Sequence, residues 1–130
     1  MLKHAVIFLI ATELLVECCQ IELSLRSNTD YPFQFEAEVP SIKKKTDRTT
    51  MTKIGQQRKV KINGPSCSHK TWIFRTYKQT KDGKWVPAET HTAKLDGNGR
   101  ALIAVNDAYI PVISDRIGVT CSEAVICARG

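Results

Sequence analysis

The stretch that decides the fold is KTWIFRTYKQTKDGKWVPAETHTAKLDGNGRALIAVN, residues 70–106. Its first part, residues 70–80, is rich in aromatic and β-branched side chains, which favours a strand. The pair Asp82-Gly83 is typical of a tight hairpin turn, because glycine readily adopts the positive φ that such turns need. Residues 85–95 then form the returning strand, in which a proline marks an edge or a bulge. The quoted stretch therefore begins with a predicted β-hairpin.

A second turn and a third strand follow in the same stretch. Residues 96–99 (DGNG) predict another hairpin turn. Residues 100–106 (RALIAVN) are apolar on both faces, as expected of a central strand. Three more short strands are expected near the end of the chain, over residues 109–113, 116–121 and 124–128.

The first half of the chain shows alternation of period two as well. Ile21, Leu23 and Leu25 alternate with polar residues. Residues 33–39 (FQFEAEV) alternate in the same way until Pro40, and this pattern is typical of half-buried strands.

Residues 41–57 (SIKKKTDRTTMTKIGQQ) differ from the strands around them. They are polar, rich in threonine and lysine, and hold few candidates for a core. We expect a long exposed basic loop there, with an edge strand over residues 49–54. Alternation resumes beyond it with Val60 and Ile62.

Short strands separated by turn signals predict an all-β fold. The 130 residues are enough for one domain, and 42% hydrophobic with 25% charged residues is an ordinary globular composition. We expect residues 20–130 to form a single antiparallel β-sandwich of the jelly-roll or carbohydrate-binding-module type. A small β-barrel is the alternative.

Residues 1–19 have the pattern of a secretory signal peptide. A basic start with Lys3 precedes the apolar run AVIFLIA, which is too short to span a membrane. Small residues before the cut favour cleavage after Cys18 over cleavage after Cys19. An amphipathic N-terminal helix of an intracellular protein is the alternative, although the run is apolar nearly all round. We therefore expect a secreted monomer without a membrane span.

Export makes disulfides possible. Cleavage after Cys18 leaves four cysteines with three possible connectivities, and the disulfide candidates are Cys19, Cys67, Cys121 and Cys127. Cleavage after Cys19 leaves one pair and one free thiol. A bridge from Cys67 to one of the last two cysteines would close a long loop. A zinc site that combines these cysteines with His69 is the competing hypothesis, but the spacings match no standard finger or ribbon, so we expect no metal and no cofactor.

The strongest local charge feature lies between residues 43 and 61, in a chain with a net charge of +6. A dense group of cations favours an anionic partner, such as an acidic protein face, a glycan or another polyanion. The competing interpretation is a solvated segment whose charges prevent edge-strand aggregation. The candidate partner-binding residues are Lys43, Lys44, Lys45, Arg48, Arg58, Lys59 and Lys61, and Lys53 belongs to the same run.

Aromatic side chains near the predicted hairpin offer a second kind of site. Trp72, Tyr77 and Trp85 form a possible ligand face that would stack sugars or bases, as in a carbohydrate-binding lectin. The competing interpretation places most of these side chains in the core or in a cross-strand cluster.

Ribonuclease-like chemistry is the enzymatic alternative. His69, Glu89 and His91, with Arg75 or Arg100, supply the residue types of an acid–base pair and a phosphate-binding cation. Any basic β protein with three histidines offers such a set. The chain has no Gly-x-Ser-x-Gly, His-Glu-x-x-His or Walker motif. We therefore expect a non-enzymatic protein and assign no catalytic residue.

Three features together indicate the class of protein to which the chain is similar. They are the leader at residues 1–19, the basic region at residues 43–61, and the three isolated cysteines Cys67, Cys121 and Cys127. The chain resembles the small secreted effectors of plant-pathogenic fungi, rust fungi in particular. That resemblance implies a protein that binds a host protein after delivery into the host cell, where an intracellular immune receptor detects it. It also implies a β-sandwich, and it implies no catalytic residues because such effectors share none.

Overall fold

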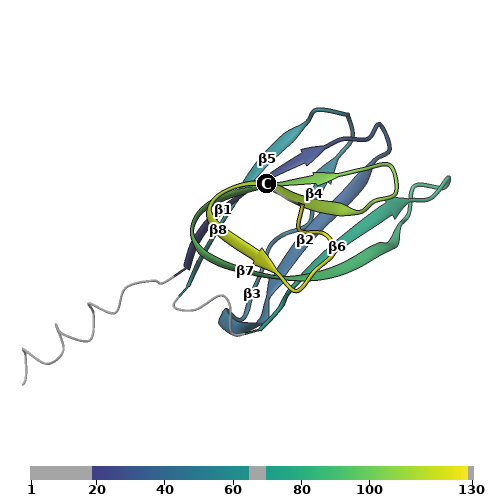
Figure 1. The fold of residues 1–130 in the computed structure, drawn as a ribbon. Coiled ribbons are helices and arrows are strands. Elements are labelled where there is room, and N and C mark those ends of the chain that lie inside the picture. The colour runs from purple at the N-terminus through teal and green to yellow at the C-terminus, as the bar shows by residue number, and fades with distance from the viewer. Residues whose placement is uncertain (1–18, 65–69, 129–130) are drawn as a thin grey trace, which may run out of the picture.

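The computed structural model describes residues 19–64 and 70–128, and these residues form a curled β-sheet (Figure 1). The elements are β1 (Cys19–Ser27), β2 (Phe33–Val39), the short 3-10 helix η1 (Pro40–Ile42), β3 (Lys44–Lys45), β4 (Thr49–Met51), β5 (Gln57–Gly64), β6 (Trp72–Gln79), β7 (Trp85–Val105) and β8 (Pro111–Ser122). The expected all-β class is confirmed. The predicted signal segment up to Cys18, as well as Cys67 and His69, lies outside the described residues.

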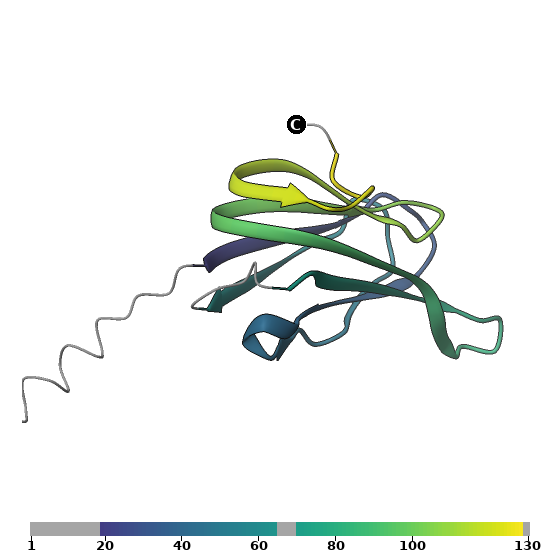
Figure 2. The same cartoon turned by 60° about the horizontal axis from the view of Figure 1, so that its bottom comes forward.

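The long strand β7 organises the sheet. The strand order is β3-β2-β6-β7-β1-β5, with β4 also paired to β2 and β8 paired to β7. The first part of β7 pairs with β6, and its second part lies between β1 and β8. Figure 2 shows that β7 passes from one layer of strands to the other. The result is a half-open barrel with the two layers of a sandwich.

One strand pairing differs from the antiparallel arrangement that we expected. β1 runs parallel to the second part of β7, from Gln20 beside Asn98 to Ser27 beside Val105. The other ladders between the described strands are antiparallel. The alternation of side chains in a strand reports which face is buried and not which strand lies beside it. The sheet is therefore mixed.

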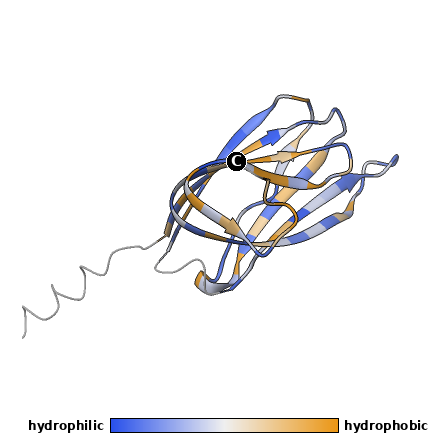
Figure 3. Ribbon diagram, in the orientation of Figure 1, coloured by the Kyte–Doolittle hydropathy of each residue, from blue (hydrophilic) through white to orange (hydrophobic). Residues whose placement is uncertain are grey.

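The core lies between the two layers and is built from the alternating positions of the strands. Every second residue of β1 is buried, as the pattern of Ile21, Leu23 and Leu25 predicted. Phe33 and Phe35 from β2 pack in the same core, which the banded colouring of the strands in Figure 3 reflects. The predicted central strand is confirmed, because the second part of β7 has a neighbour on each side.

The DGNG sequence does not form the predicted hairpin turn, because it lies inside β7. Gly97 has a φ of 116°, and the pairing between β7 and β8 shifts register on both sides of Arg100. A Cβ atom on Gly99 would lie 1.8 Å from the carbonyl oxygen of Ile117. These glycines therefore permit a close backbone approach at a β-bulge. The Asp82-Gly83 hairpin is as predicted, with the Thr80 amide bonded to the Lys84 carbonyl at 2.8 Å.

The segment at residues 41–57 is more ordered than the exposed loop that we expected. β3 and β4 both pair with β2, and β4 falls within the predicted edge strand at residues 49–54. Met51 is fully buried, and the Thr46 amide donates to the Ala37 carbonyl at 2.9 Å. Backbone pairing to β2 thus holds this basic segment against the sheet.

The C-terminal part also differs in detail from the expectation. The predicted strands at 109–113 and 116–121 are parts of the single strand β8, and residues 124–128 form only an isolated bridge from Cys127 to Ile113. Cys121 and Cys127 form a disulfide with each other, so neither bridges to Cys67 or is a thiolate ligand for zinc. Cys19 is disulfide-bonded too. Within the described ranges, no helix has the length and apolar character needed to cross a membrane.

Candidate binding groove between the sheet edges

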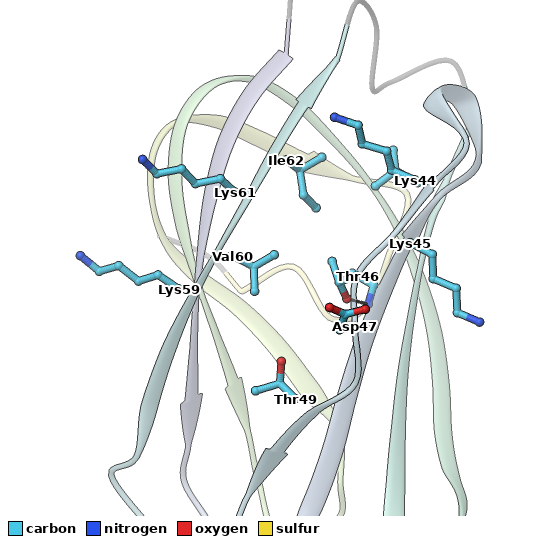
Figure 4. A pocket seen from close by; sticks show the side chains of 11 residues that line it. Lys44, Lys45, Thr46, Asp47, Thr49, Lys59, Val60, Lys61 and Ile62 are labelled. Atoms are coloured by element: carbon cyan, nitrogen blue, oxygen red, sulfur yellow. Dashed lines mark hydrogen bonds between the residues drawn. The ribbon is translucent and has the colours of Figure 1, made fainter.

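A groove of about 410 Å³ lies on the open side of the curled sheet (Figure 4). β5 borders one side of it, and the segment that contains β3 and β4 borders the other. These strands stand at the two ends of the strand order, and the curl of the sheet brings them face to face. We call this feature the edge groove.

The floor of the edge groove is apolar. Ala37 and Val39 reach it from β2, and both are almost fully buried. Val60 and Ile62 point into it from β5. The alternation of β5 is responsible, because residues two apart on a strand share a face.

The rim of the edge groove is positively charged. Lys59 and Lys61 alternate with the floor residues of β5 and point away from the cavity, while Lys44 stands on the opposite side. Lys59 makes an ion pair with Glu22 at 3.6 Å but remains 70% exposed. Asp47 is the only acidic residue in the lining. The groove thus combines an apolar floor with a mainly basic border.

One end of the edge groove is closed by side chains. The Lys44 Nζ donates a hydrogen bond to the Asn63 carbonyl of β5. Ile42 packs closely against Gly64, where a Cβ would lie 2.7 Å from the Ile42 Cγ2 atom. The two sheet edges therefore touch at this end through side chains and not through a backbone ladder.

A second cluster of charges lies on the outer face of β2 and β6, and we call it the Glu36 network. The Glu36 side chain is only 3% exposed, and its carboxylate lies within 3.8 Å of the charged nitrogens of Lys45, Arg48 and Arg75. The Tyr77 hydroxyl donates to Glu36 Oε1 at 2.5 Å, and the Arg48 guanidinium lies 3.7 Å from the centre of the Tyr77 ring. A buried carboxylate loses its hydration, and nearby cations and hydrogen-bond donors offset that cost.

Tyr77 is held in its neutral form by this environment. Burial raises the pKa of Tyr77 above 10.0, and the hydrogen bond to Glu36 and the negative charge of Glu36 raise it further. Arg48 and Arg75 act in the opposite direction. The hydroxyl therefore remains a donor to Glu36 in neutral solution.

The structure divides the candidate partner-binding cations into three groups. Three of them stand at the edge groove outside the Glu36 network: Lys44, Lys59 and Lys61. Two belong to the Glu36 network: Lys45, which also lines the groove, and Arg48. Two are exposed and do not line the groove: Lys43 and Arg58. Cations from one basic run of the sequence therefore lie both at the edge groove and in the Glu36 network.

The possible aromatic ligand face does not form as one surface. Trp72 is fully buried and packs against Phe74, with ring centroids 6.1 Å apart. Tyr77 belongs to the Glu36 network, and Trp85 is half-buried at the start of β7. Trp72 shares its strand face with the core residue Phe74, which is the physical reason that this side chain is unavailable for stacking on a ligand.

The residues of the ribonuclease hypothesis are dispersed over the sheet. His91 Nε2 lies 3.5 Å from Glu89 Oε1. Arg75 points to the outer face of β6, whereas His91 lies opposite the inward-facing Phe74. Arg100 lies in the second part of β7, beyond the residues that pair with β6. The described residues therefore place no candidate arginine beside His91 on the same face of the β6–β7 ladder.

Sequence reasoning missed both the Glu36 network and the floor of the edge groove. Glu36 occupies an outward position of a clean alternating strand, so its pattern indicates an exposed residue. The signal for the floor was present in Val60 and Ile62, which alternate with lysines. The sequence pattern does not show that these two residues belong to an edge strand, whose only strand partner among the described residues is β1.

Comparisons with known proteins place the chain in no family. No family model matches it, and no curated protein matches it. Among solved structures it is similar to the crystal structure of the human-specific toxin intermedilysin, with 8% identity and a TM-score of 0.37. The similarity covers 75% of this chain and 23% of that one. At this level of similarity we draw no functional conclusion from it.

Proposed function

We propose that this chain is a secreted, non-enzymatic interaction protein that holds an acidic segment of a partner protein in the edge groove. The observation that carries the proposal is the combination of an apolar floor with a lysine rim. Charged residues around an apolar centre are a common arrangement of protein-binding surfaces. The cations at the rim would steer an acidic partner and set its register.

Disulfide bonding supports the export part of the proposal. The Cys121–Cys127 bridge and the bonded state of Cys19 suit an oxidising compartment. Cys19 is fully buried at the start of β1. Cleavage of the leader after Cys18 would leave this residue in the sheet, whereas cleavage after Cys19 would remove it. We therefore propose the cut after Cys18.

The effector role is a proposal from the resemblance in overall type. In that role the acidic partner belongs to a host cell, and the edge groove is the surface that contacts it. An exposed surface of this kind would also be available to a host immune receptor.

Charge reversal at the rim tests the proposed function. The probe is a fluorescent polyglutamate peptide, and the variant is Lys59→Glu combined with Lys61→Glu. We expect binding to weaken at least about tenfold, because attraction at the rim becomes repulsion. Fluorescence anisotropy at several salt concentrations measures the affinity, and the wild type should bind less tightly as screening increases.

A matched control separates the groove from net charge. Lys78→Glu combined with Lys84→Glu changes the charge equally at exposed positions around the β6–β7 turn. This control should alter affinity less than about twofold. Equal losses in the two double variants would mean that the whole surface attracts the probe, and the groove would be rejected as its site.

A further inference from the structure

Over residues 57–61, the described part of the structure leaves one edge of β5 open beside the groove. Among the described residues β1 is its only strand partner. β5 has eight residues, whereas β3 and β4 on the other side have two and three. An added strand requires an uninterrupted row of unpaired backbone groups, which only β5 offers at this groove.

Backbone alternation shows which groups of β5 face that edge. The Ser27 amide of β1 bonds to the carbonyl of Gln56, just before β5. Backbone groups of successive residues point to opposite sides of a strand, so those of Lys59 and Lys61 face away from β1. Asn63 falls in the same set, and its carbonyl indeed accepts a hydrogen bond from a lysine across the groove. The hydrogen bond from Lys44 to the Asn63 carbonyl thus agrees with the side of β5 that the backbone alternation assigns to the open edge.

The side chains of β5 define what an added strand would carry. One face of such a strand would lie over the apolar floor with Val60 and Ile62. Its other face would lie beside Lys59 and Lys61. Directly opposed side chains on neighbouring strands interact, and opposite charges stabilise the pair. The matching segment therefore alternates apolar and acidic residues.

We infer that the partner segment binds by adding a strand to β5, as an extended stretch of alternating apolar and acidic residues. This inference rests on the proposed function and specifies its binding mode. The segment pairs with residues 57–61, because the contact between Lys44 and Asn63 occupies the next part of the edge. Backbone hydrogen bonds supply affinity, and the floor and the rim supply specificity.

Two peptides of equal composition test the binding mode. One alternates valine with glutamate, and the other places the valines in one block and the glutamates in another. Strand addition predicts at least about tenfold tighter binding of the alternating peptide, as measured by anisotropy. N-methylation of every second amide of this peptide provides a further test. One of the two methylated series should lose binding and the other should retain it, because only one set of amides faces β5.

A substitution on the protein side gives an independent test. Lys61→Pro removes both the charge and the edge-facing N–H, while Lys61→Ala removes the charge alone. The ladder between β1 and β5 should survive both changes, since the amide of residue 61 faces the open edge. We expect Lys61→Pro to bind the alternating peptide several-fold more weakly than Lys61→Ala, with similar melting temperatures. Should the proline variant fail to fold, the methylated peptides decide the question.

The outcomes separate the inference from the proposed function. Equal affinity for the alternating and block peptides, with no effect of N-methylation, would reject strand addition but leave an acid-binding groove. Failure of polyglutamate and both peptides to bind would reject the groove function itself. Heparin binding that survives Lys59→Glu/Lys61→Glu, without any peptide binding, would assign the basic surface to a polyanion and reject both proposals.

Discussion

The edge groove and the Glu36 network both take cations from residues 43–61 but use them in opposite ways. In the Glu36 network a buried carboxylate collects Lys45, Arg48 and Arg75. At the edge groove Lys59 and Lys61 border an apolar floor and remain exposed to solvent. The difference teaches that the density of charged residues along a chain is a poor guide to which of them can bind a partner. Cations without a buried counter-charge can engage a partner, whereas cations paired with a buried acid chiefly stabilise the fold.

Removal of the central acid should give the largest effect on stability. We expect Glu36→Gln to lower the free energy of unfolding by about 2 kcal/mol, because three cations lose a buried counter-charge. The same change at Glu22, which pairs with the exposed Lys59, should cost less than about 0.5 kcal/mol. Urea denaturation measures both. Similar losses at the two sites would remove the distinction between the two regions.

A smaller effect is expected from loss of the Tyr77 hydroxyl. Tyr77→Phe should destabilise the fold by about 1 kcal/mol, because Glu36 loses a hydrogen bond. The folded pKa of Tyr77 lies above 10.0, so the unfolded chain ionises first. The stabilisation is complete below pH 10 and is lost as the pH rises through the folded pKa. Denaturation at alkaline pH should show this component in the wild type and in Tyr31→Phe, an exposed control, but not in Tyr77→Phe.

Within the Glu36 network, the smallest of the three stability effects is expected at Arg48. Its guanidinium stacks on Tyr77 but its side chain is 47% exposed, so Arg48→Ala should cost up to about 1 kcal/mol. Arg48→Lys keeps the charge but not the planar stacking, and should recover only part of the loss. The exposed Lys53 is the matched control, for which Lys53→Ala should be neutral in thermal unfolding. A neutral Arg48→Ala would show that the stacking contributes nothing to the fold.

Several features of the fold and of the site follow from local pattern alone. Alternation in β1 and β2 correctly identifies the buried face, because a strand repeats every two residues. The Asp82-Gly83 turn is predictable because its backbone requirement is local. The lysines of the edge groove were predicted as binding residues from charge density, and their binding role stays a prediction.

The sequence by itself determined the all-β class, the buried faces of β1 and β2, and the place of the basic run. Only the tertiary structure decided that β1 lies parallel to β7, that the DGNG segment forms a bulge beside Ile117 and Gly118, and that Glu36 is buried. Each of these depends on a partner far away in the chain. Local propensity fixes the conformation of a few residues, whereas pairing and burial depend on which surface closes over them.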